Sequence, residues 1–328
     1  MIKMKRTLVT GAAGFIGFHL SNALLAAGHK VAGLDNMNNY YDVSLKQARL
    51  AYLQNNEQFE FLQADIENRG IVRDMIQNGG FDTVVNLAAQ AGVRYSLTHP
   101  EAYIQSNLTG FFNVLDACKE YAVPHLVYAS SSSVYGANTH LPFSEQDKTD
   151  TPVSLYAATK KANELMAHSY SSMFGLKTTG FRFFTVYGPY GRPDMALFTF
   201  TKNILEDKPI QIYNNGDMQR DFTYVDDIVA GISALMEKSA ALSATDVPCR
   251  VYNIGSSRPV HLMDFVKAIE AELGKKAIIE LMPMQVGDVK CTYADVSQMK
   301  HDTSFVPKTP LADGIHEFVS WYREYYGR

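Results

Sequence analysis

The stretch Thr7-Leu-Val-Thr-Gly11-Ala-Ala-Gly14-Phe-Ile-Gly17 decides the fold. The short apolar run Thr7–Thr10 is typical of a buried strand, and a helical pattern follows over Ile16–Ala27. Glycines in the turn between them let a pyrophosphate approach backbone N–H groups at the start of a helix. Asp35 follows Gly17 by 18 residues, where a carboxylate accepts ribose hydroxyls and repels a 2′-phosphate. The stretch therefore predicts NAD rather than NADP, against the plainer alternative of a glycine-rich helix start with a solvated aspartate.

The rest of the first half alternates short apolar runs with patterns of period about 3.6, which is typical of helices. Such alternation predicts an α/β fold, a doubly wound sheet of parallel strands joined by right-handed helical crossovers. The predicted strands are Thr7–Thr10, Val31–Leu34, Phe59–Leu62, Thr83–Leu87, Leu126–Ala129 and Thr178–Phe184. The predicted helices include Ile16–Ala27, Tyr103–Tyr121 and Tyr156–Phe174.

After about residue 185 the composition shifts toward loops rich in Gly, Pro, Asn and Ser, as in Gly188–Asp194. A last helix is predicted over Asp313–Tyr326. We expect residues 1–184 to form a dinucleotide-binding domain, to which the chain returns around 225–255. Residues 185–328 then form mainly a smaller, interleaved lobe that binds the substrate.

Composition excludes several classes of protein. The 328 residues include 30 basic and 34 acidic ones, a formal charge of −4, so no basic excess favours nucleic acid. Cys118, Cys249 and Cys291 are odd in number and lack CxxC spacing, which predicts neither a zinc site nor a disulfide framework and fits a reducing compartment. No uninterrupted run of about 18 apolar residues predicts a membrane span. We expect a cytoplasmic protein without a metal.

The pattern Tyr156-Ala-Ala-Thr-Lys160 places a phenol and an ammonium one turn apart on one helix face. An ammonium beside a phenol favours the phenolate, which must form well below the ordinary tyrosine pKa of about 10 to act near neutrality. Upstream, the run Ser130–Ser133 follows the strand Leu126–Ala129, at the end of the sheet where parallel sheets bind ligands. Alone, each pattern also fits surface residues or a plain turn; together with the glycine turn they indicate proton transfer.

The GxxGxxG spacing, Asp35, the pair Asp65-Ile66 and the run Leu87-Ala88-Ala89-Gln90 resemble the extended short-chain dehydrogenases/reductases. The resemblance implies a Rossmann-type fold and tightly bound NAD. It implies Tyr156, Lys160 and Ser131 as catalytic residues, with Ser132 and Ser133 facing the sugar. The implied cofactor site comprises Gly11, Gly14, Phe15, Ile16, Gly17, Asp35, Asn36, Asp65, Ile66, Leu87, Ala88, Ala89, Tyr156 and Lys160.

Motifs across nearly the whole chain are similar to the sugar-nucleotide epimerase/dehydratase branch of that family. They include Asn107, Phe183–Pro189, Gln219–Phe222, Tyr224–Asp227 and Gly287–Val289. The resemblance implies that Arg220 holds a diphosphate with its planar fork of donors and that Asp288 accepts ribose hydroxyls. Without the resemblance, either residue would fit a surface ion pair.

Three further segments, Asp35–Asp42, Gln90–Ser96 and Gly191–Ala196, closely resemble UDP-glucuronate 4-epimerases. Thr185 and Gln285 stand where UDP-glucose 4-epimerases carry Asn and Arg, and the serine run lacks the Asp-Glu pair of the dehydratases. The implied reaction is NAD-dependent epimerisation of UDP-glucuronate to UDP-galacturonate through a transient 4-ketone. The alternatives are a 4-epimerase of a neutral UDP-hexose or its N-acetyl form, a UDP-glucuronate decarboxylase, and a non-catalytic NAD(H)-sensing protein.

The 4-keto uronate is a β-keto acid, which loses CO2 when its carboxylate bond aligns with the carbonyl π system. An epimerase must therefore hold that carboxylate out of alignment. We expect Ser131, Ser132, Ser133 and Thr185 to do so with hydroxyl groups, with Arg94 or Arg192 nearby; the pattern leaves open which arginine makes the contact. The resemblance also implies a homodimer that pairs helices Tyr103–Tyr121 and Tyr156–Phe174 across a two-fold axis.

Overall fold

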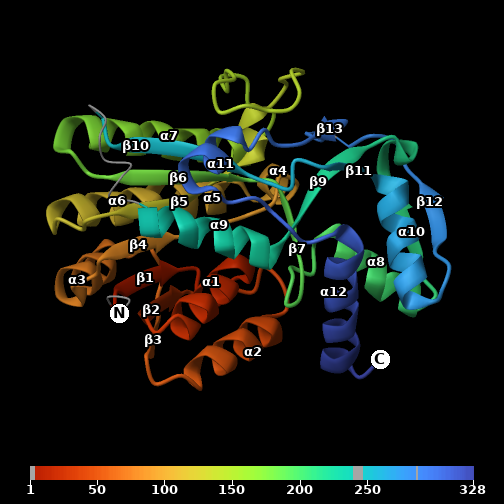
Figure 1. Ribbon diagram of the computed structural model, residues 1–328, viewed down its shortest axis with the longest axis horizontal. Helices are drawn as coiled ribbons and strands as arrows, with labels where there is room; N and C mark the ends of the chain where they lie inside the picture. Colours follow the sequence, from red (N-terminus) through yellow and green to blue (C-terminus); the bar gives the residue numbers. More distant parts are fainter. Residues whose placement is uncertain (1–3, 239–246, 286) are drawn as a thin grey trace.

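The computed structural model describes residues 4–238, 247–285 and 287–328. Its centre is a seven-stranded sheet in the order β10-β6-β5-β4-β1-β2-β3, with every neighbouring pair parallel (Figure 1). Its strands are β1 (Arg6–Thr10), β2 (Lys30–Asp35), β3 (Phe59–Gln63), β4 (Thr83–Asn86), β5 (Leu126–Ser131), β6 (Thr178–Phe183) and β10 (Cys249–Ile254). The predicted doubly wound α/β sheet is confirmed, and β10 adds a seventh strand to the six predicted ones.

Helices cover both faces of this sheet because neighbouring strand residues point to opposite sides. In β1, Leu8 packs with the cluster formed by α3, α6 and α7, whereas Val9 packs with the cluster formed by α1 and α9. The helices are α1 (Phe15–Ala26), α2 (Val43–Gln54), α3 (Arg69–Gly79), α4 (Tyr95–Thr98), α5 (Pro100–Tyr103), α6 (Phe111–Glu120), α7 (Leu155–Phe174), α9 (Val225–Lys238) and α11 (Ser297–Thr303). The strand order reverses between β1 and β4, which places a ligand-binding crevice at their carboxyl ends.

The segment predicted as a helix over Tyr103–Tyr121 is helical almost to its end, but it is not one regular α-helix. The structure has α5, a π-helical segment over Ile104–Gly110 and then α6. Tertiary hydrogen bonds hold Asn107 inside this segment: its side chain accepts from the Gln90 N–H at 2.8 Å and donates to the Gln90 carbonyl at 3.0 Å. The Asn163 side-chain amide donates a hydrogen bond to the Asn107 carbonyl oxygen at 2.7 Å. The widened turn thus fixes the loop after β4, as π-segments often do near functional sites.

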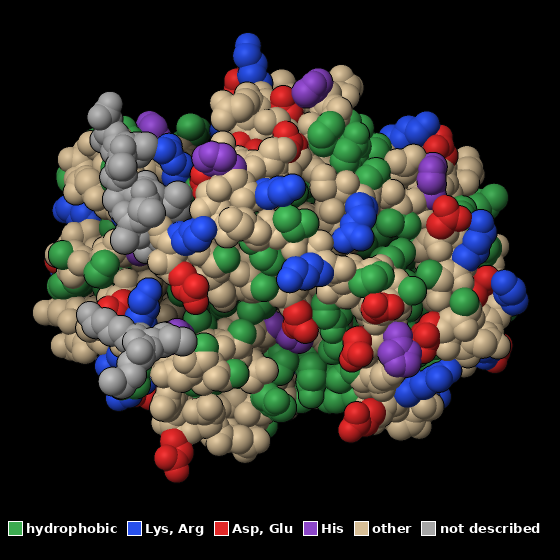
Figure 2. All heavy atoms as spheres, in the orientation of Figure 1, with side chains coloured by type: hydrophobic (Ala, Val, Ile, Leu, Met, Phe, Trp, Pro, Cys, Tyr) green, Lys and Arg blue, Asp and Glu red, His purple; other side chains and the backbone are tan. Residues whose placement is uncertain are grey.

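The second lobe packs around strand β9, which pairs with β7, β11 and β13. Its core joins residues of α8, α10 and α12 to Leu45 of α2 in the first lobe, and Figure 2 shows apolar side chains where these parts meet. The elements are β7 (Thr185–Tyr187), α8 (Ala196–Leu205), β8 (Pro209–Ile212), a 3₁₀ turn (Tyr213–Gly216), β9 (Gln219–Tyr224), β11 (Pro259–His261), α10 (Leu262–Leu273), β12 (Ile278–Leu281), β13 (Cys291–Thr292) and α12 (Leu311–Tyr326). The predicted terminal helix is confirmed as α12.

Within residues 4–238, 247–285 and 287–328, no helix combines the length and apolar character that crossing a membrane requires. The same residues contain no group of three or more His, Cys, Asp or Glu side chains that could hold a metal ion.

Candidate active site

A cleft at the reversal of strand order gathers residues that lie far apart in the sequence. Every residue predicted for the cofactor lines it, and so do Ser131 and Arg192. The sequence prediction gave no role to several other lining residues, namely Asn38, Tyr40, Lys46, Ser106, Phe183 and Met195. The predicted residues Ser132, Ser133, Arg94, Arg220 and Asp288 lie outside this lining, and Thr185 lines an adjoining pocket together with Arg192.

The glycine turn of the cleft leaves no room for side chains. Gly11 has φ +72°, and a Cβ atom there would lie 2.8 Å from the Ala88 backbone nitrogen. A Cβ atom on Gly17 would lie 2.1 Å from the Gly11 carbonyl oxygen. Gly14 is the N-cap of α1 and offers no side chain to the free N–H groups of the first turn. The turn therefore forms a cradle that fits a pyrophosphate at a helix N-terminus.

Asp35 lies buried at the carboxyl end of β2. Its Oδ2 accepts from the Ala13 N–H at 3.2 Å and its Oδ1 from the Met37 N–H at 2.9 Å. Lys46 of α2 places its Nζ 3.6 Å from Oδ1 and is itself almost fully buried. The sequence prediction missed Lys46 because a lysine in a helix is usually exposed, and only the fold turns it toward the strand end.

One end of the cleft is formed by two neighbouring strand ends, those of β2 and β3. The Asn36 side chain donates to Asp65 Oδ2 at 2.8 Å, which joins the loops after β2 and β3. Ile66 is buried beside them. With the glycine cradle and the Asp35 carboxylate, this arrangement fits a dinucleotide that carries an unphosphorylated ribose.

Helix α7 carries the predicted proton-transfer pair. It begins after Ser154, whose side chain accepts from the Ala157 N–H. Burial raises the pKa of Tyr156, while a hydrogen bond with Ser131 and the positive charge of Arg192 oppose the rise. Burial lowers the pKa of Lys160 to about 8, and its ammonium donates to the Ala129 carbonyl at 2.8 Å. Arg192 is thus a cation that favours the phenolate of Tyr156, an effect that the sequence prediction gave to Lys160 alone.

Arg192 reaches the cleft from the loop before α8. Its guanidinium forms a bidentate ion pair with Asp194, in which Nε donates to Oδ1 at 3.0 Å and Nη2 donates to Oδ2. The Tyr40 hydroxyl donates to the same carboxylate at 3.1 Å. Asp194 lies in a segment that the sequence prediction quoted but gave no role, and no sequence signal joins it to Tyr40, because the two stand more than 150 residues apart.

A second cluster of charged residues joins Arg94, which precedes α4, to residues of the second lobe. The exposed Arg94 places Nη2 3.4 Å from Asp288 Oδ2 and its guanidinium 4.7 Å from the centre of the Tyr213 ring. The Arg220 guanidinium donates to the carbonyl oxygens of Gln219 at 2.8 Å and Lys290 at 3.2 Å. Burial lowers the pKa of Arg220, and the Asp288 carboxylate opposes that shift. Asp288 thus pairs with Arg94 and acts electrostatically on Arg220, an arrangement that can receive a diphosphate and a hydroxyl group.

Comparison with known proteins agrees with this geometry. Residues 7–255 match the model of the NAD dependent epimerase/dehydratase family. The chain is 53% identical over 332 residues to Protein CapI of Staphylococcus aureus, which covers 98% of this chain and 99% of that protein. It is 46% identical over 335 residues to the probable UDP-glucuronate 4-epimerase of Rhizobium meliloti, which covers 98% of each chain.

Among solved structures, the UDP-glucuronic acid 4-epimerase from Bacillus cereus in complex with UDP-glucuronic acid and NAD superposes with a TM-score of 0.90. It is 34% identical, over 98% of this chain and 100% of that one. The resemblance predicted from the motifs is therefore confirmed, and the chain belongs to the NAD dependent epimerase/dehydratase family.

Proposed function

We propose that this chain is an NAD-dependent UDP-glucuronate 4-epimerase that interconverts UDP-glucuronate and UDP-galacturonate. The observation that carries the proposal is the convergence of Tyr156, Ser131 and Arg192 beside a cradle that fits a dinucleotide. The relatives support it, since the Rhizobium meliloti protein is named a probable UDP-glucuronate 4-epimerase and the Bacillus cereus enzyme binds UDP-glucuronic acid and NAD.

The glycine turn, Asp35 and the Asp65-Ile66 pair would hold NAD, and Lys160 would reach its nicotinamide ribose. NAD+ held there would supply a reversible hydride acceptor for sugar C4, so that the hydride can be regained on the opposite face of the 4-ketone. Tyr156 takes the proton of the 4-hydroxyl group, with Ser131 bridging the two oxygens. Ser131 and Arg192 both favour the phenolate form of Tyr156, which a general base requires.

The diphosphate would bind Arg220, and the uridine ribose would donate to Asp288. For the sugar carboxylate, the geometry favours Arg192 over Arg94, because Arg192 lines the cleft with Tyr156 while Arg94 pairs with Asp288. Thr185 lines a pocket next to Arg192, and Ser132 and Ser133 continue the turn from Ser131. A charge-assisted contact contributes about 1.5–3 kcal/mol against about 1 kcal/mol for a neutral hydroxyl, so Arg192 would dominate selectivity for a uronate.

One observation favours a second candidate, a 4-epimerase of a neutral UDP-hexose. Asp194 already satisfies the charge of Arg192, so a neutral hydroxymethyl group would leave no unpaired cation in the cleft. The test incubates the purified protein separately with UDP-glucuronate and UDP-glucose and identifies the products by chromatography. UDP-galacturonate is the expected product; epimerisation of UDP-glucose alone would establish the neutral substrate, and release of CO2 with a pentose nucleotide would establish a decarboxylase.

The Tyr156→Phe variant is the control for that test. It should keep its bound NAD and lose at least about 10²-fold in turnover, the usual scale for a lost general base. Both properties are measured on one sample, the first from the nucleotide released on denaturation. Turnover within a few-fold of the wild-type value would remove Tyr156 from the proposed mechanism.

We further propose a cytoplasmic homodimer. Leu165, Met173 and Phe174 expose large apolar surfaces on α7, one of the two helices that the family resemblance places at a dimer interface. The three cysteines are free, which suits a reducing compartment. Light scattering after gel filtration tests the dimer, and a monomer mass would reject it.

For the domains, the pairing of β10 with β6 supports the proposed return of the chain to the first domain around 225–255.

A further inference from the structure

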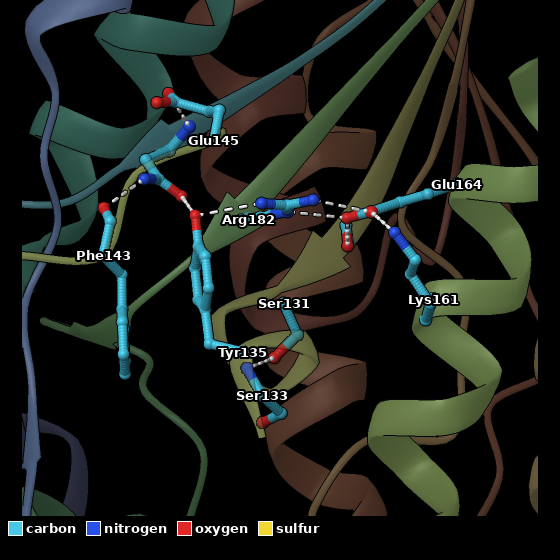
Figure 3. Close-up of polar contacts among 10 residues, drawn as sticks. Ser131, Ser133, Tyr135, Phe143, Glu145, Lys161, Glu164 and Arg182 are labelled. Atoms are coloured by element: carbon cyan, nitrogen blue, oxygen red, sulfur yellow. Dashed lines mark hydrogen bonds and ion pairs between the residues drawn. The ribbon is translucent and has the colours of Figure 1, made fainter. Parts of the chain in front are cut away.

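The serine turn, Ser130–Tyr135, comprises the last two residues of β5 and the 3₁₀ turn that follows, and hydrogen bonds hold both of its ends (Figure 3). At one end, Ser130 Oγ donates to Glu164 Oε1 at 2.6 Å. At the other, the Tyr135 hydroxyl accepts from Arg182 Nη1 at 3.0 Å. The three residues proposed to contact the reacting sugar, Ser131–Ser133, lie between these two ties.

One buried ion pair connects the two ties. Arg182 Nε and Nη2 donate to the two carboxylate oxygens of Glu164, each at 2.8 Å, and both side chains are only 5% exposed. Burial raises the pKa of Glu164, but the hydrogen bonds and charge of Arg182 outweigh it, so the carboxyl remains ionised. A buried pair with two parallel hydrogen bonds has a single favourable geometry, so Ser130 and Tyr135 are held in one relative position.

The same pair fixes the turn against helix α7. Tyr156, Lys160 and Glu164 follow at intervals of four residues, so they share one face of the helix. They contact three successive residues at the end of β5, namely Ser131, the Ala129 carbonyl and Ser130, respectively. The register between α7 and the turn therefore depends on Glu164 as well as on the proposed catalytic residues.

Tyr135 extends this network toward β10. Its hydroxyl donates to Asn253 Oδ1 at 2.6 Å, and the Asn253 amide donates to the Phe143 carbonyl at 2.7 Å. Its ring stacks on Phe143 with centroids 4.4 Å apart. The hydroxyl is thus enclosed between the Arg182 donor and the Asn253 acceptor, and its removal leaves two buried polar groups without that partner.

We infer that Tyr135, Glu164 and Arg182 are positioning residues, which aim the Ser131–Ser133 hydroxyls at Tyr156 and at the substrate carboxylate. The inference rests on the proposed function, because it assigns to these residues the suppression of CO2 loss from the 4-keto uronate. In that side reaction, the bond between C5 and the carboxylate carbon breaks and CO2 leaves. The electron pair forms an enolate that takes up a proton at C5, and NADH remains in the enzyme because the hydride is not returned.

The experiment compares Tyr135→Phe and Ser130→Ala with Lys161→Met. Lys161 is the matched control, since its ammonium lies 3.6 Å from the same Glu164 carboxylate and it is not one of the residues that hold the ends of the serine turn. With UDP-glucuronate, each test variant should raise the ratio of decarboxylated product to epimer about fivefold, the scale of one neutral hydrogen bond. NADH should accumulate in parallel, and KM should stay near the wild-type value because Arg220 and Asp288 are unchanged. The control should match the wild type.

A second measurement needs no turnover. Ultraviolet difference titration against the same protein carrying Tyr156→Phe reports the pKa of Tyr156 in the holoenzyme. Because the Ser131 hydrogen bond lowers that pKa, it should rise in Tyr135→Phe and Ser130→Ala and stay constant in Lys161→Met. If the wild type does not epimerise the uronate, the proposed function fails, and this titration still decides the positioning role.

An unchanged product ratio together with an unchanged titration in both test variants would overturn the inference. An equal change in Lys161→Met would also overturn it, since the effect would then follow from any loss of charge near Glu164. If Tyr135→Phe does not fold, Ser130→Ala decides by the same two measurements.

Discussion

The cofactor cleft and the Arg94–Arg220 cluster are built by opposite means. In the cleft, backbone groups and glycines form the cradle, and an added side-chain atom would meet backbone within 3 Å. In the cluster, two guanidinium groups and one carboxylate form the site, and the backbone contributes only the carbonyl oxygens that hold Arg220. The glycine cradle should therefore be the part most sensitive to added volume, while the cluster should be most sensitive to loss of the Arg220 charge.

Adding one methyl group to the cradle should have the largest effect. In Gly17→Ala, the new Cβ would lie 2.1 Å from the Gly11 carbonyl oxygen, so the turn must shift away from its binding geometry. Overpacking of this kind costs about 1–3 kcal/mol, and with the lost backbone contacts we expect NAD affinity to fall by at least about 10²-fold. The NAD content of the purified protein and its affinity by calorimetry measure the change.

Gly70→Ala is the matched control, because a Cβ there meets only the Asn68 side chain at an ordinary 3.5 Å. It lies in α3 and should leave NAD content unchanged. If Gly17→Ala retained full NAD content, the cradle would not be the cofactor site. The claim that the cleft is sensitive to added volume would then fail.

The junction of the two lobes should show the next largest effect, in acid. The Nε2 atom of His19, in α1, lies 2.8 Å from the Pro189 carbonyl oxygen. Burial lowers the pKa of His19 from 6.5 to about 4. Between pH 6.5 and 4, His19 is protonated in the unfolded chain but remains neutral in the folded chain. The free energy of unfolding therefore decreases as the pH falls through this window. His19→Asn should remove up to about 3 kcal/mol of that loss.

Chemical denaturation of both proteins at pH 7 and pH 4 measures the difference in unfolding free energy. His140→Asn changes an exposed histidine and serves as the control. Equal acid sensitivity of wild type and His19→Asn would show that this contact between the lobes does not resist protonation.

Removing the half-buried charge of the cluster, Arg220, should come third. In Arg220→Met, loss of a charge-assisted contact of about 1.5–3 kcal/mol should raise KM for the UDP-sugar about 10–100-fold. NAD content and melting temperature should remain those of the wild type, since the cofactor cleft is separate. Steady-state kinetics provide the measurement. Loss of NAD from Arg220→Met would show that the cofactor cleft and the charged cluster are not independent.

The same contrast explains what the sequence could predict. The glycine turn, Asp35 and the strand–helix alternation were predictable because each depends on residues close together in the chain. The π-helical segment could not be predicted, because the hydrogen bonds of Asn107 with Gln90 and Asn163 form only when the fold brings the segment, the loop after β4 and α7 together. Lys46 was missed for the same reason.

Around Arg192, the sequence supplied the residue but not its partners. Asp194 is close in sequence, yet Tyr40 and Tyr156 reach the same place from the loop after β2 and from α7. Likewise, Glu164 and Arg182 lie on different elements, and no local pattern joins them to the serine turn. Motifs thus predicted the glycine turn, Asp35 and the Tyr156–Lys160 pair that line the cleft, while the groups that orient such residues required the structure.

Removing the exposed charge of the cluster should have the smallest effect and tests how burial weights the two arginines. Arg94 is 56% exposed at its side chain and 3.4 Å from Asp288, and such exposed pairs contribute about 0–1 kcal/mol. Arg94→Met should therefore raise KM by at most about fivefold, with unchanged kcat and no decarboxylated product. An effect as large as that of Arg220→Met would show that burial does not separate the two residues. A rise in decarboxylated product would instead assign the carboxylate contact to Arg94 rather than Arg192, because Arg94 contacts Asp288 and Tyr213 and not the network that positions the serine turn.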